Sequence, residues 1–239
     1  IITGTGNLTL NGSSTVTGTV GNSTTSLGNI NANGIAGKTV TFANNVYATN
    51  TNIGAGTVDI KGNLTGAVKS TSPGVGTLTT TGIIDQIITG TVGNIGNLNI
   101  SNIGHSTTVT GNVNAVNTKI DSTLIMTDGS NITSTIKTSK DSQGILTFLG
   151  DSIATGTIGT HTEKLAQINA ADTGKTVRFN SSLNADKLNL IADGTVVLAY
   201  NSNINSSITT TINNQGTLDF EGNSTVTGEI GTSLESLKE

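Results

Sequence analysis

Short alternations of hydrophobic and polar residues recur along the whole chain. Apolar and polar residues alternate within 38–42, and apolar residues again stand two apart at 8–10 and at 146–148. A period of two places successive side chains on opposite faces of a strand, whereas an amphipathic helix needs a period of about 3.6 residues. The pattern therefore predicts many short β-strands, each with one face turned inward.

Pairs of Gly with Asn or Asp interrupt these alternations. Examples are Asn33-Gly34, Gly62-Asn63, Asp128-Gly129 and Asp193-Gly194. Such residues tolerate a positive φ, so we interpret the pairs as corners at which one strand gives way to the next. A helical pattern is compatible only with the last residues, 232–239. They are either the start of a helix with Ser233 as its N-cap or a tail that acts as a linker.

A long repeat organises the strands. The block GNLTLNGSSTVTGTVG begins at Gly6, and related blocks begin at Gly76, Gly144 and Gly216, so the period is about 70 residues. Further blocks align between them, 27–48 with 165–185 and 52–68 with 190–208. Three blocks in one period give roughly 23 residues per block, a length that suits one turn of a wide parallel β-helix.

Stacked turns would satisfy one another's backbone hydrogen bonds and bury one another's apolar side chains. We therefore predict an all-β fold, a parallel β-helix of about ten turns built from ~70-residue repeats of about three turns each. Residues 1–231 are expected to form one continuous solenoid.

The composition supports this prediction and narrows the possible partners. The chain has 31 Gly, one Pro, no Cys and no Trp, and only 11% of its residues are charged. A disulfide framework is excluded, and the low charge is unlike that of disordered chains. The 11 Lys and Arg residues are scattered and the net charge is −4, so nucleic acid is not an expected partner.

Two observations concern membranes and export. No apolar run approaches the ~18 residues of a membrane-spanning helix. The first residues, IITGTG, lack the basic and apolar regions of a secretory signal. We therefore expect the chain to be a segment of a longer protein.

The tripeptide GKT occurs twice, with its lysine at Lys38 and at Lys175. A phosphate-binding loop needs an earlier glycine and a following helix, so that backbone amides and the helix dipole face the phosphate. Here Ala32 and Asn169 replace that glycine, and strand patterns follow. We interpret both tripeptides as turns that lead into strands.

Candidate metal ligands and catalytic groups are few. His105 and His161 are the two histidines, and no acidic residue stands at a zinc-ligand spacing from either. Asp219 and Glu221 would share one face of a strand, in the manner of a carboxylate pair of a glycan-cleaving enzyme, but the other repeats have no acidic counterparts. We interpret the pair as solvated and expect no catalytic residue, metal or cofactor.

Two polar stretches without strand alternation come just before G-x-L blocks. They are 69–75, which holds the only Pro, and 137–143. Both occupy the same phase of the long repeat, so we expect them to project from the same corner. Loops of a solenoid can vary without breaking its register. Either they are solvated turns, or they bind a partner through Lys69, Pro73, Lys137, Lys140 and Asp141.

The motifs together resemble those of a known family. The blocks G-x-L-T-x-x-G, T-G-x-[VI]-G, INA and GKTVxF, in a chain rich in Thr, Asn and Gly, resemble the passenger regions of rickettsial surface cell antigen autotransporters of the outer membrane protein A and B type. The resemblance extends from Gly6 to Gly231 and includes no catalytic motif.

This resemblance implies a right-handed β-helical passenger on the bacterial outer membrane or cell surface, where it adheres to host cells and promotes entry. It would bind a host cell-surface protein, or serve as the stalk for an adhesive tip. Membrane contact would be made only through a C-terminal barrel outside these residues. A carbohydrate-active β-helix enzyme and a structural surface-coat protein are the alternative functions.

Overall fold

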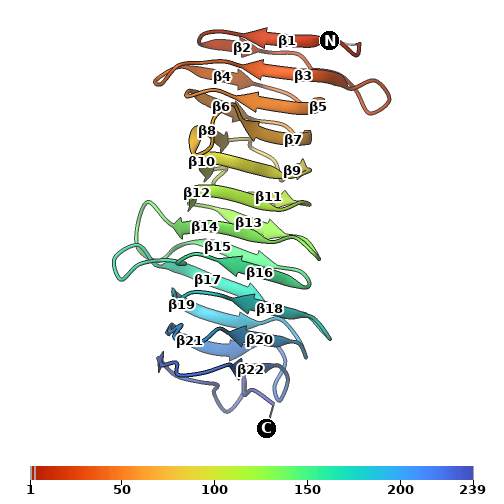
Figure 1. Ribbon diagram of the computed structural model, residues 1–239. Coiled ribbons are helices and arrows are strands. Elements are labelled where there is room, and N and C mark those ends of the chain that lie inside the picture. Colours follow the sequence, from red (N-terminus) through yellow and green to blue (C-terminus); the bar gives the residue numbers. More distant parts are fainter. Residues whose placement is uncertain (1, 3, 239) are drawn as a thin grey trace. The chain divides into compact units, whose positions relative to one another are not determined.

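The computed structural model of the chain describes Ile2 and residues 4–238, and within them it contains strands and turns but no helix. The strands pack into two compact units, residues 1–118 and 119–239. Each unit is a stack of parallel β-helical turns, and the two units together contain about 11 turns (Figure 1). The predicted all-β parallel β-helix is confirmed.

The strands are short, as the alternations predict. In the first unit they are β1 (Asn7–Leu10), β2 (Ser14–Val16), β3 (Leu27–Ala32), β4 (Thr39–Phe42), β5 (Val46–Ile53), β6 (Thr57–Ile60), β7 (Leu64–Ser70), β8 (Val75–Thr80), β9 (Gln86–Thr89), β10 (Val92–Ile100), β11 (Ser106–Val109) and β12 (Val113–Ile120), whose last residues belong to the second unit. In the second unit they are β13 (Thr123–Met126), β14 (Ile132–Lys137), β15 (Gln143–Phe148), β16 (Ser152–Thr155), β17 (Leu165–Ala170), β18 (Thr176–Phe179), β19 (Leu183–Leu190), β20 (Thr195–Leu198), β21 (Ile204–Thr210), β22 (Thr217–Phe220) and β23 (Val226–Thr227).

Parallel pairing builds three ladders of strands in the first unit. Ladder A joins β1, β3, the second halves of β5 and β7, and the first residues of β10. Ladder B joins β2, β4, β6, β8 and the second half of β10. Ladder C joins Val20, the first halves of β5 and β7, β9 and β11. Each turn therefore has three sides.

The second unit has the same three-sided construction. Ladder D joins β13, β15, β17 and the second halves of β19 and β21. Ladder E joins the start of β14 to β16, β18, β20 and β22. Ladder F joins the end of β14, Ile158, the first halves of β19 and β21, and β23.

The core consists of inward side chains stacked turn upon turn. Val40 and Phe42 of β4 pair with Val58 and Ile60 of β6, and all four side chains are buried. In the second unit the rings of Phe148 and Phe179 meet edge to face with their centroids 5.8 Å apart. Burying such a side chain contributes roughly 1.5–3 kcal/mol, so the stack is held mainly by these columns.

Asn and Asp side chains join successive turns at the corners. The Asp85 carboxylate accepts a hydrogen bond from the backbone N–H of Ser106, at 2.7 Å, and the Asn131 side-chain oxygen accepts one from the N–H of Ile153, also at 2.7 Å. Each bond satisfies an N–H that would lack a ladder partner where the strand pairing stops. Asn and Asp residues at such corners therefore have a structural role.

Asparagines on the outer surface of ladder A also stack in files. Asn29 donates to Asn7, 22 residues earlier, at 3.0 Å, and Asn50 donates to Asn29, 21 residues earlier, at 3.1 Å. Identical amides stacked on parallel strands can each donate and accept along the file. This arrangement makes a polar outer surface compatible with regular stacking.

Two glycines of the long repeat stand where two turns approach closely. Gly156, in the T-G-x-[VI]-G motif, has a φ of 107°, and a Cβ there would lie 2.2 Å from the carbonyl oxygen of Ser134. Gly76, which opens the second repeat, has a φ of 76°, and its Cβ would lie 2.4 Å from the carbonyl oxygen of Gly54. Only glycine fits both the conformation and the space.

The long repeat is not a whole number of turns. Leu8 of the first repeat lies on ladder A, whereas its counterpart Leu78 in the second lies on ladder B. In the second unit Leu146 lies on ladder D and its counterpart Leu218 on ladder E. One period therefore covers three turns and one further side. A repeat is thus slightly longer than the expected three turns. Equivalent residues of successive repeats lie on different sides, so the repeat no longer predicts that they share a corner.

Two local predictions have opposite outcomes. Both GKT tripeptides form turns that lead into strands, β4 and β18, as predicted. The helix at 232–239 is wrong for the described residues up to 238, which have no helix. Instead, the Thr232 hydroxyl accepts hydrogen bonds from the N–H groups of Leu234 and Glu235, and the Ser236 N–H binds Asn213 of the preceding turn. These bonds to local and neighbouring-turn partners replace helical ones.

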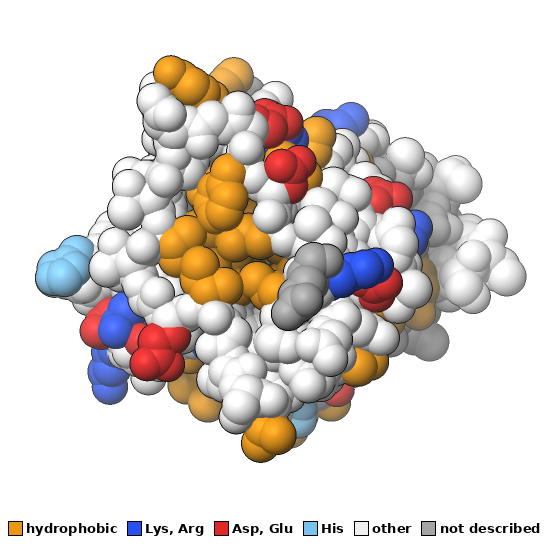
Figure 2. All heavy atoms as spheres, turned by 90° about the horizontal axis from the view of Figure 1, so that it is seen from below, with side chains coloured by type: hydrophobic (Ala, Val, Ile, Leu, Met, Phe, Trp, Pro, Cys, Tyr) orange, Lys and Arg blue, Asp and Glu red, His pale blue; other side chains and the backbone are white. Residues whose placement is uncertain are grey.

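The last turn leaves part of its inward surface open. Phe220 of β22 pairs with buried Leu198 but is 38% exposed, and Ile230 is 53% exposed. Figure 2, which views this end of the second unit, shows hydrophobic side chains gathered at the centre of the face and ringed by polar ones. The inward surface of this last turn is thus largely apolar.

Candidate partner-binding site

The stretch predicted at 137–143 lies at a corner of the second unit. It connects β14 on ladder F with β15 on ladder D, and the residues between these strands form a turn. One turn later a second loop, Thr160–Lys164, leads into β17 at the same corner, and the Ser142 N–H donates to the carbonyl oxygen of Lys164 at 3.0 Å. The two loops are therefore stacked directly on each other.

Lys164 links the neighbouring turns at this corner. Its backbone N–H donates to Asp141 at 3.0 Å, and its ammonium group lies 3.9 Å from the other oxygen of the same carboxylate. The ammonium also contacts the Asp186 carboxylate of β19 at 2.6 Å. Lys164 thus carries one charge between two carboxylates from neighbouring turns.

A second ion pair flanks the first. The Lys137 ammonium, at the end of β14, lies 3.4 Å from the Glu163 carboxylate. The Thr160 hydroxyl accepts the N–H of Glu163 at 2.9 Å, which shapes the loop that carries Glu163 and Lys164. Ion pairs between exposed groups contribute little to stability, so these charges are available for binding at small cost to the fold.

The pairing also changes how the charged groups titrate. The hydrogen bond to Asp186, followed by its charge, raises the pKa of Lys164 above its ordinary value of 10.5. Burial acts to raise the pKa of Asp186, but hydrogen bonds from Lys164 and Ser142 and the lysine's charge hold it below 3.8. Both groups are therefore ionised throughout the neutral range.

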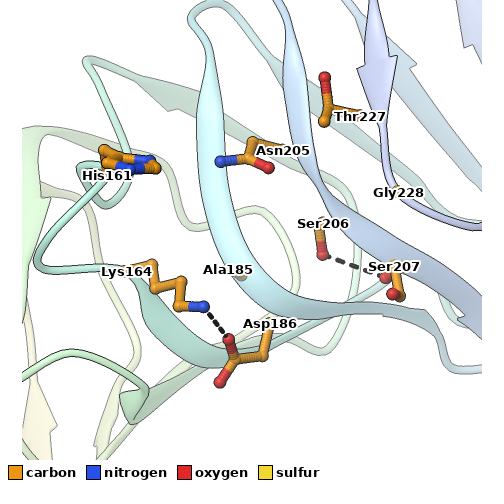
Figure 3. A pocket seen from close by; sticks show the side chains of 9 residues that line it. All are labelled: His161, Lys164, Ala185, Asp186, Asn205, Ser206, Ser207, Thr227 and Gly228. Carbon is orange, nitrogen blue, oxygen red and sulfur yellow. Dashed lines mark hydrogen bonds and ion pairs between the residues drawn. The ribbon is translucent and has the colours of Figure 1, made fainter.

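A polar hollow of about 430 Å³ opens beside these loops (Figure 3). In this view the side chain of Lys164 points to Asp186, while His161 stands apart on its loop. The opposite wall comes from β21 and β23, where Asn205 pairs with Thr227. The lining residues are His161, Lys164, Ala185, Asp186, Asn205, Ser206, Ser207, Thr227 and Gly228.

This hollow offers hydrogen-bonding groups and charges of both signs. Its lining contains hydroxyls, an amide, an imidazole, an ammonium group and a carboxylate. A polar peptide segment carrying a charged side chain could exchange one partner of the Lys164 ion pair for its own. Within the described residues no group of three or more His, Cys, Asp or Glu side chains is placed to hold a metal ion.

The predicted partner-binding residues fall into two places. Lys137, Lys140 and Asp141 lie at this corner. Of the two lysines only Lys140 is exposed, because Lys137 pairs with Glu163. Asp141 pairs with Lys164. Lys137 is therefore half-buried, whereas Asp141 stays exposed beside Lys164. Their charges are held by opposite charges from the next turn.

Lys69 and Pro73 lie in the first unit. Lys69 is near the end of β7, and Pro73 is in the turn before β8; both are exposed. The turn is closed by the N–H of Val75, which donates to the carbonyl oxygen of Ser72 at 3.2 Å. Since one repeat is three turns and one further side, a shared corner with 137–143 no longer follows from the repeat.

Sequence reasoning missed His161, Lys164 and Asp186. The stretch 160–164, THTEK, is polar and lacks strand alternation, so the same criterion that selected 137–143 could have selected it. Asp186 gave no such signal because it lies inside a regular strand pattern.

Two exposed isoleucines at a corner of the first unit were also missed. Ile83 and Ile103 occupy corner loops one turn apart and are 86% and 82% exposed. The loops are tied by Asp85, whose carboxylate accepts hydrogen bonds from the N–H and hydroxyl of Ser106. Residues 83–88, IIDQII, have the apolar composition of a strand, so no sign of this turn was visible in the sequence.

Asp219 and Glu221 do not form a paired site. Asp219 lies on β22. Glu221, directly after that strand, forms a two-pronged ion pair with Arg178, two turns away.

Comparisons with family models, curated proteins and solved structures find no match. Among the described residues, no helix is long and apolar enough to cross a membrane.

Proposed function

We propose that this chain is a surface-displayed passenger segment of an autotransporter that acts in adhesion to host cells, and that the corner carrying Lys164 is where it contacts a host cell-surface protein. The proposal is supported by the parallel β-helix and by the resemblance of the repeat blocks to such passengers. The observation that carries the binding site is the placement of Lys164 between Asp141 and Asp186 at the rim of the hollow.

The arrangement separates a stacking part of the molecule from a binding part. The inward columns and the outer amide files are occupied with contacts between turns, so they cannot change without disturbing their neighbours. The loops at 138–142 and 160–164 lie outside the ladders and hold their charged groups in fixed positions through ion pairs. Fixed charges reduce the entropy lost when a charged partner binds.

The partner expected here is a protein surface that presents charged and polar groups. The hollow contains both an ammonium and a carboxylate, so a complementary surface would bring one group of each sign. Binding dominated by such groups should weaken as the salt concentration rises, because exposed charges are screened.

The test uses the 239-residue protein and membranes from host cells. One variant replaces residues 138–142 by a Gly/Ser connector of equal length, and a matched variant does the same at 71–74 in the first unit. We expect the first replacement to abolish binding and the second to leave it intact, with both proteins keeping the β-signature in circular dichroism. Binding that survives the first replacement would contradict the assignment of this corner. Absence of binding by the unaltered protein would contradict the adhesive function itself.

A further inference from the structure

Four residue pairs in the chain have the sequence needed for spontaneous backbone chemistry. They are Asn11-Gly12, Asn33-Gly34, Asp128-Gly129 and Asp193-Gly194. Glycine has no Cβ, so its nitrogen is sterically open to reaction with the preceding side chain.

In an Asn-Gly pair the glycine nitrogen loses its proton and attacks the Asn side-chain carbonyl carbon. The new N–C bond closes a five-membered imide as the C–N bond to the side-chain nitrogen breaks, and ammonia leaves carrying the transferred proton. Water then opens the imide at either carbonyl and leaves aspartate or isoaspartate. The reaction consumes one water and needs no other reagent.

The structure blocks two of the four pairs. The N–H of Gly129 donates to the carbonyl oxygen of Asp151 at 2.8 Å, and that of Gly194 donates to Ala192 at 2.9 Å. The preceding carboxylates are also engaged, Asp128 with Lys175 at 2.7 Å and Asp193 with Lys238 at 3.2 Å. A backbone N–H that donates a hydrogen bond loses its proton less readily, so its nitrogen is a poor nucleophile. An ionised carboxylate in an ion pair is a poor electrophile.

The other two pairs differ in access. Within the described residues, neither the N–H of Gly12 nor that of Gly34 has a hydrogen-bond partner. Gly12 is half-buried, with no atom within 4 Å of where a Cβ would be, and Asn11 is exposed. Gly34 is buried, and the Lys38 side chain lies 3.4 Å from the corresponding point.

We propose that Asn11 is a site of spontaneous deamidation in the folded protein, and that it reacts before Asn33 and long before either Asp-Gly pair isomerises. Water and base reach the Gly12 nitrogen directly, whereas the buried Gly34 nitrogen is shielded. The rate rises with pH because the attacking group is the deprotonated nitrogen.

Reaction at Asn11 changes the corner between ladders A and B. Asn33 donates to the side-chain oxygen of Asn11 at 3.4 Å, so the new charge appears against the amide of the next turn. An isoaspartate also adds one methylene to the backbone between β1 and β2. A second carboxylate at Asn33 would then face a like charge one turn away, at about 4.8 Å between strands, which opposes ionisation of the second site.

The test is incubation of the folded protein at mildly alkaline pH, followed by tryptic digestion and tandem mass spectrometry. Fragment ions of the peptide ending at Lys38 separate the products at Asn11 from those at Asn33, and labelling by an isoaspartyl methyltransferase detects isoaspartate at all four pairs. We expect product at Asn11 first. In urea at the same pH, Asn33 should react as fast as Asn11, which shows that folding selects between the two Asn-Gly pairs.

Two variants complete the test. Gly12→Ala places a methyl group in open space and should slow product formation at Asn11 many-fold, while Gly34→Ala should leave the Asn11 rate unchanged. Asn11→Gln, which would need a larger ring, provides a second loss of product if Gly12→Ala alters the melting temperature. Equal or faster reaction at Asn33, or labelling at the Asp-Gly pairs in the folded protein at the rate of Asn11, would overturn the proposal.

Discussion

The ammonium group of Lys175 lies 2.7 Å from the carboxylate of Asp128, which is 47 residues earlier in the chain. It also lies 3.4 Å from Asp151, so one lysine of a GKT tripeptide joins three stacked corners. The Asp128 carboxylate also accepts the N–H of Asp151 at 2.7 Å. The lysine of a tripeptide that suggests phosphate binding is thus engaged in holding turns together.

The first prediction concerns this contact. Asp128→Asn keeps the acceptor for the N–H of Asp151 but removes the ion pair, so we expect a small fall in melting temperature that disappears at high salt. The hydrogen bond from Lys175 lowers the pKa of Asp128 below its ordinary value of 3.8.

The sign of the pH dependence follows from that lowered pKa. The stabilisation is fully present above pH 3.8 and is lost as the pH falls through the folded-state pKa, because the unfolded chain then binds the proton more readily. Melting curves of the two proteins should therefore converge in acid. A difference that grows as the pH falls would contradict the ion pair.

The second prediction concerns the aromatic contact in the core. Phe148 is fully buried against Phe179, so Phe148→Ala should lower the free energy of unfolding by about 3–5 kcal/mol, as in other buried Phe truncations. Urea titration followed by circular dichroism measures the change. Phe220→Ala is the matched control, since Phe220 is 38% exposed and should cost clearly less. Equal costs would show that the last turn is covered in solution.

The third prediction uses equivalent glycines of the long repeat. Gly76→Ala should destabilise the protein strongly, because its φ is 76° and the new Cβ would lie 2.4 Å from a carbonyl oxygen. Gly6 holds the same place in the first repeat, but no atom lies within 4 Å of the position that a Cβ would take there, so Gly6→Ala should be tolerated. Thermal melting of both variants decides the matter, and a tolerated Gly76→Ala would count against the close approach of these turns.

The fourth prediction separates two isoleucines near the same corner. Ile88 on β9 is 1% exposed, whereas Ile83 in the preceding loop is 86% exposed. Ile88→Thr buries a hydroxyl and leaves space in the core, so it should lower stability markedly. Ile83→Thr should change the free energy of unfolding by no more than about 0.5 kcal/mol. Chemical denaturation of both variants measures these changes. A large loss of free energy of unfolding in Ile83→Thr would show that the Ile83 side chain is covered in solution.

Local patterns along the chain were sufficient for the fold class. The alternation at 38–42 predicted β4, and the same pattern predicted β18, because period two is a property of the strand itself. The GKT turns were predictable for a similar reason. The tail at 232–238 was not, because its hydrogen bonds to Asn213 come from the preceding turn and leave no signal within the tail.

The sequence by itself therefore determined the parallel β-helix, its corners and the turn within 137–143. Only the tertiary structure decided which residues meet across turns. Turns differ in length, from 18 residues between Asn45 and Asn63 to 26 between Ser13 and Thr39, so a repeat of about 70 residues ends one side further round than it began. Lys164 meets Asp186 because Leu165 of β17 pairs with Ala185 of β19. That register depends on how the chain turns between the two strands and packs on its neighbours, which no local pattern within 164–186 specifies.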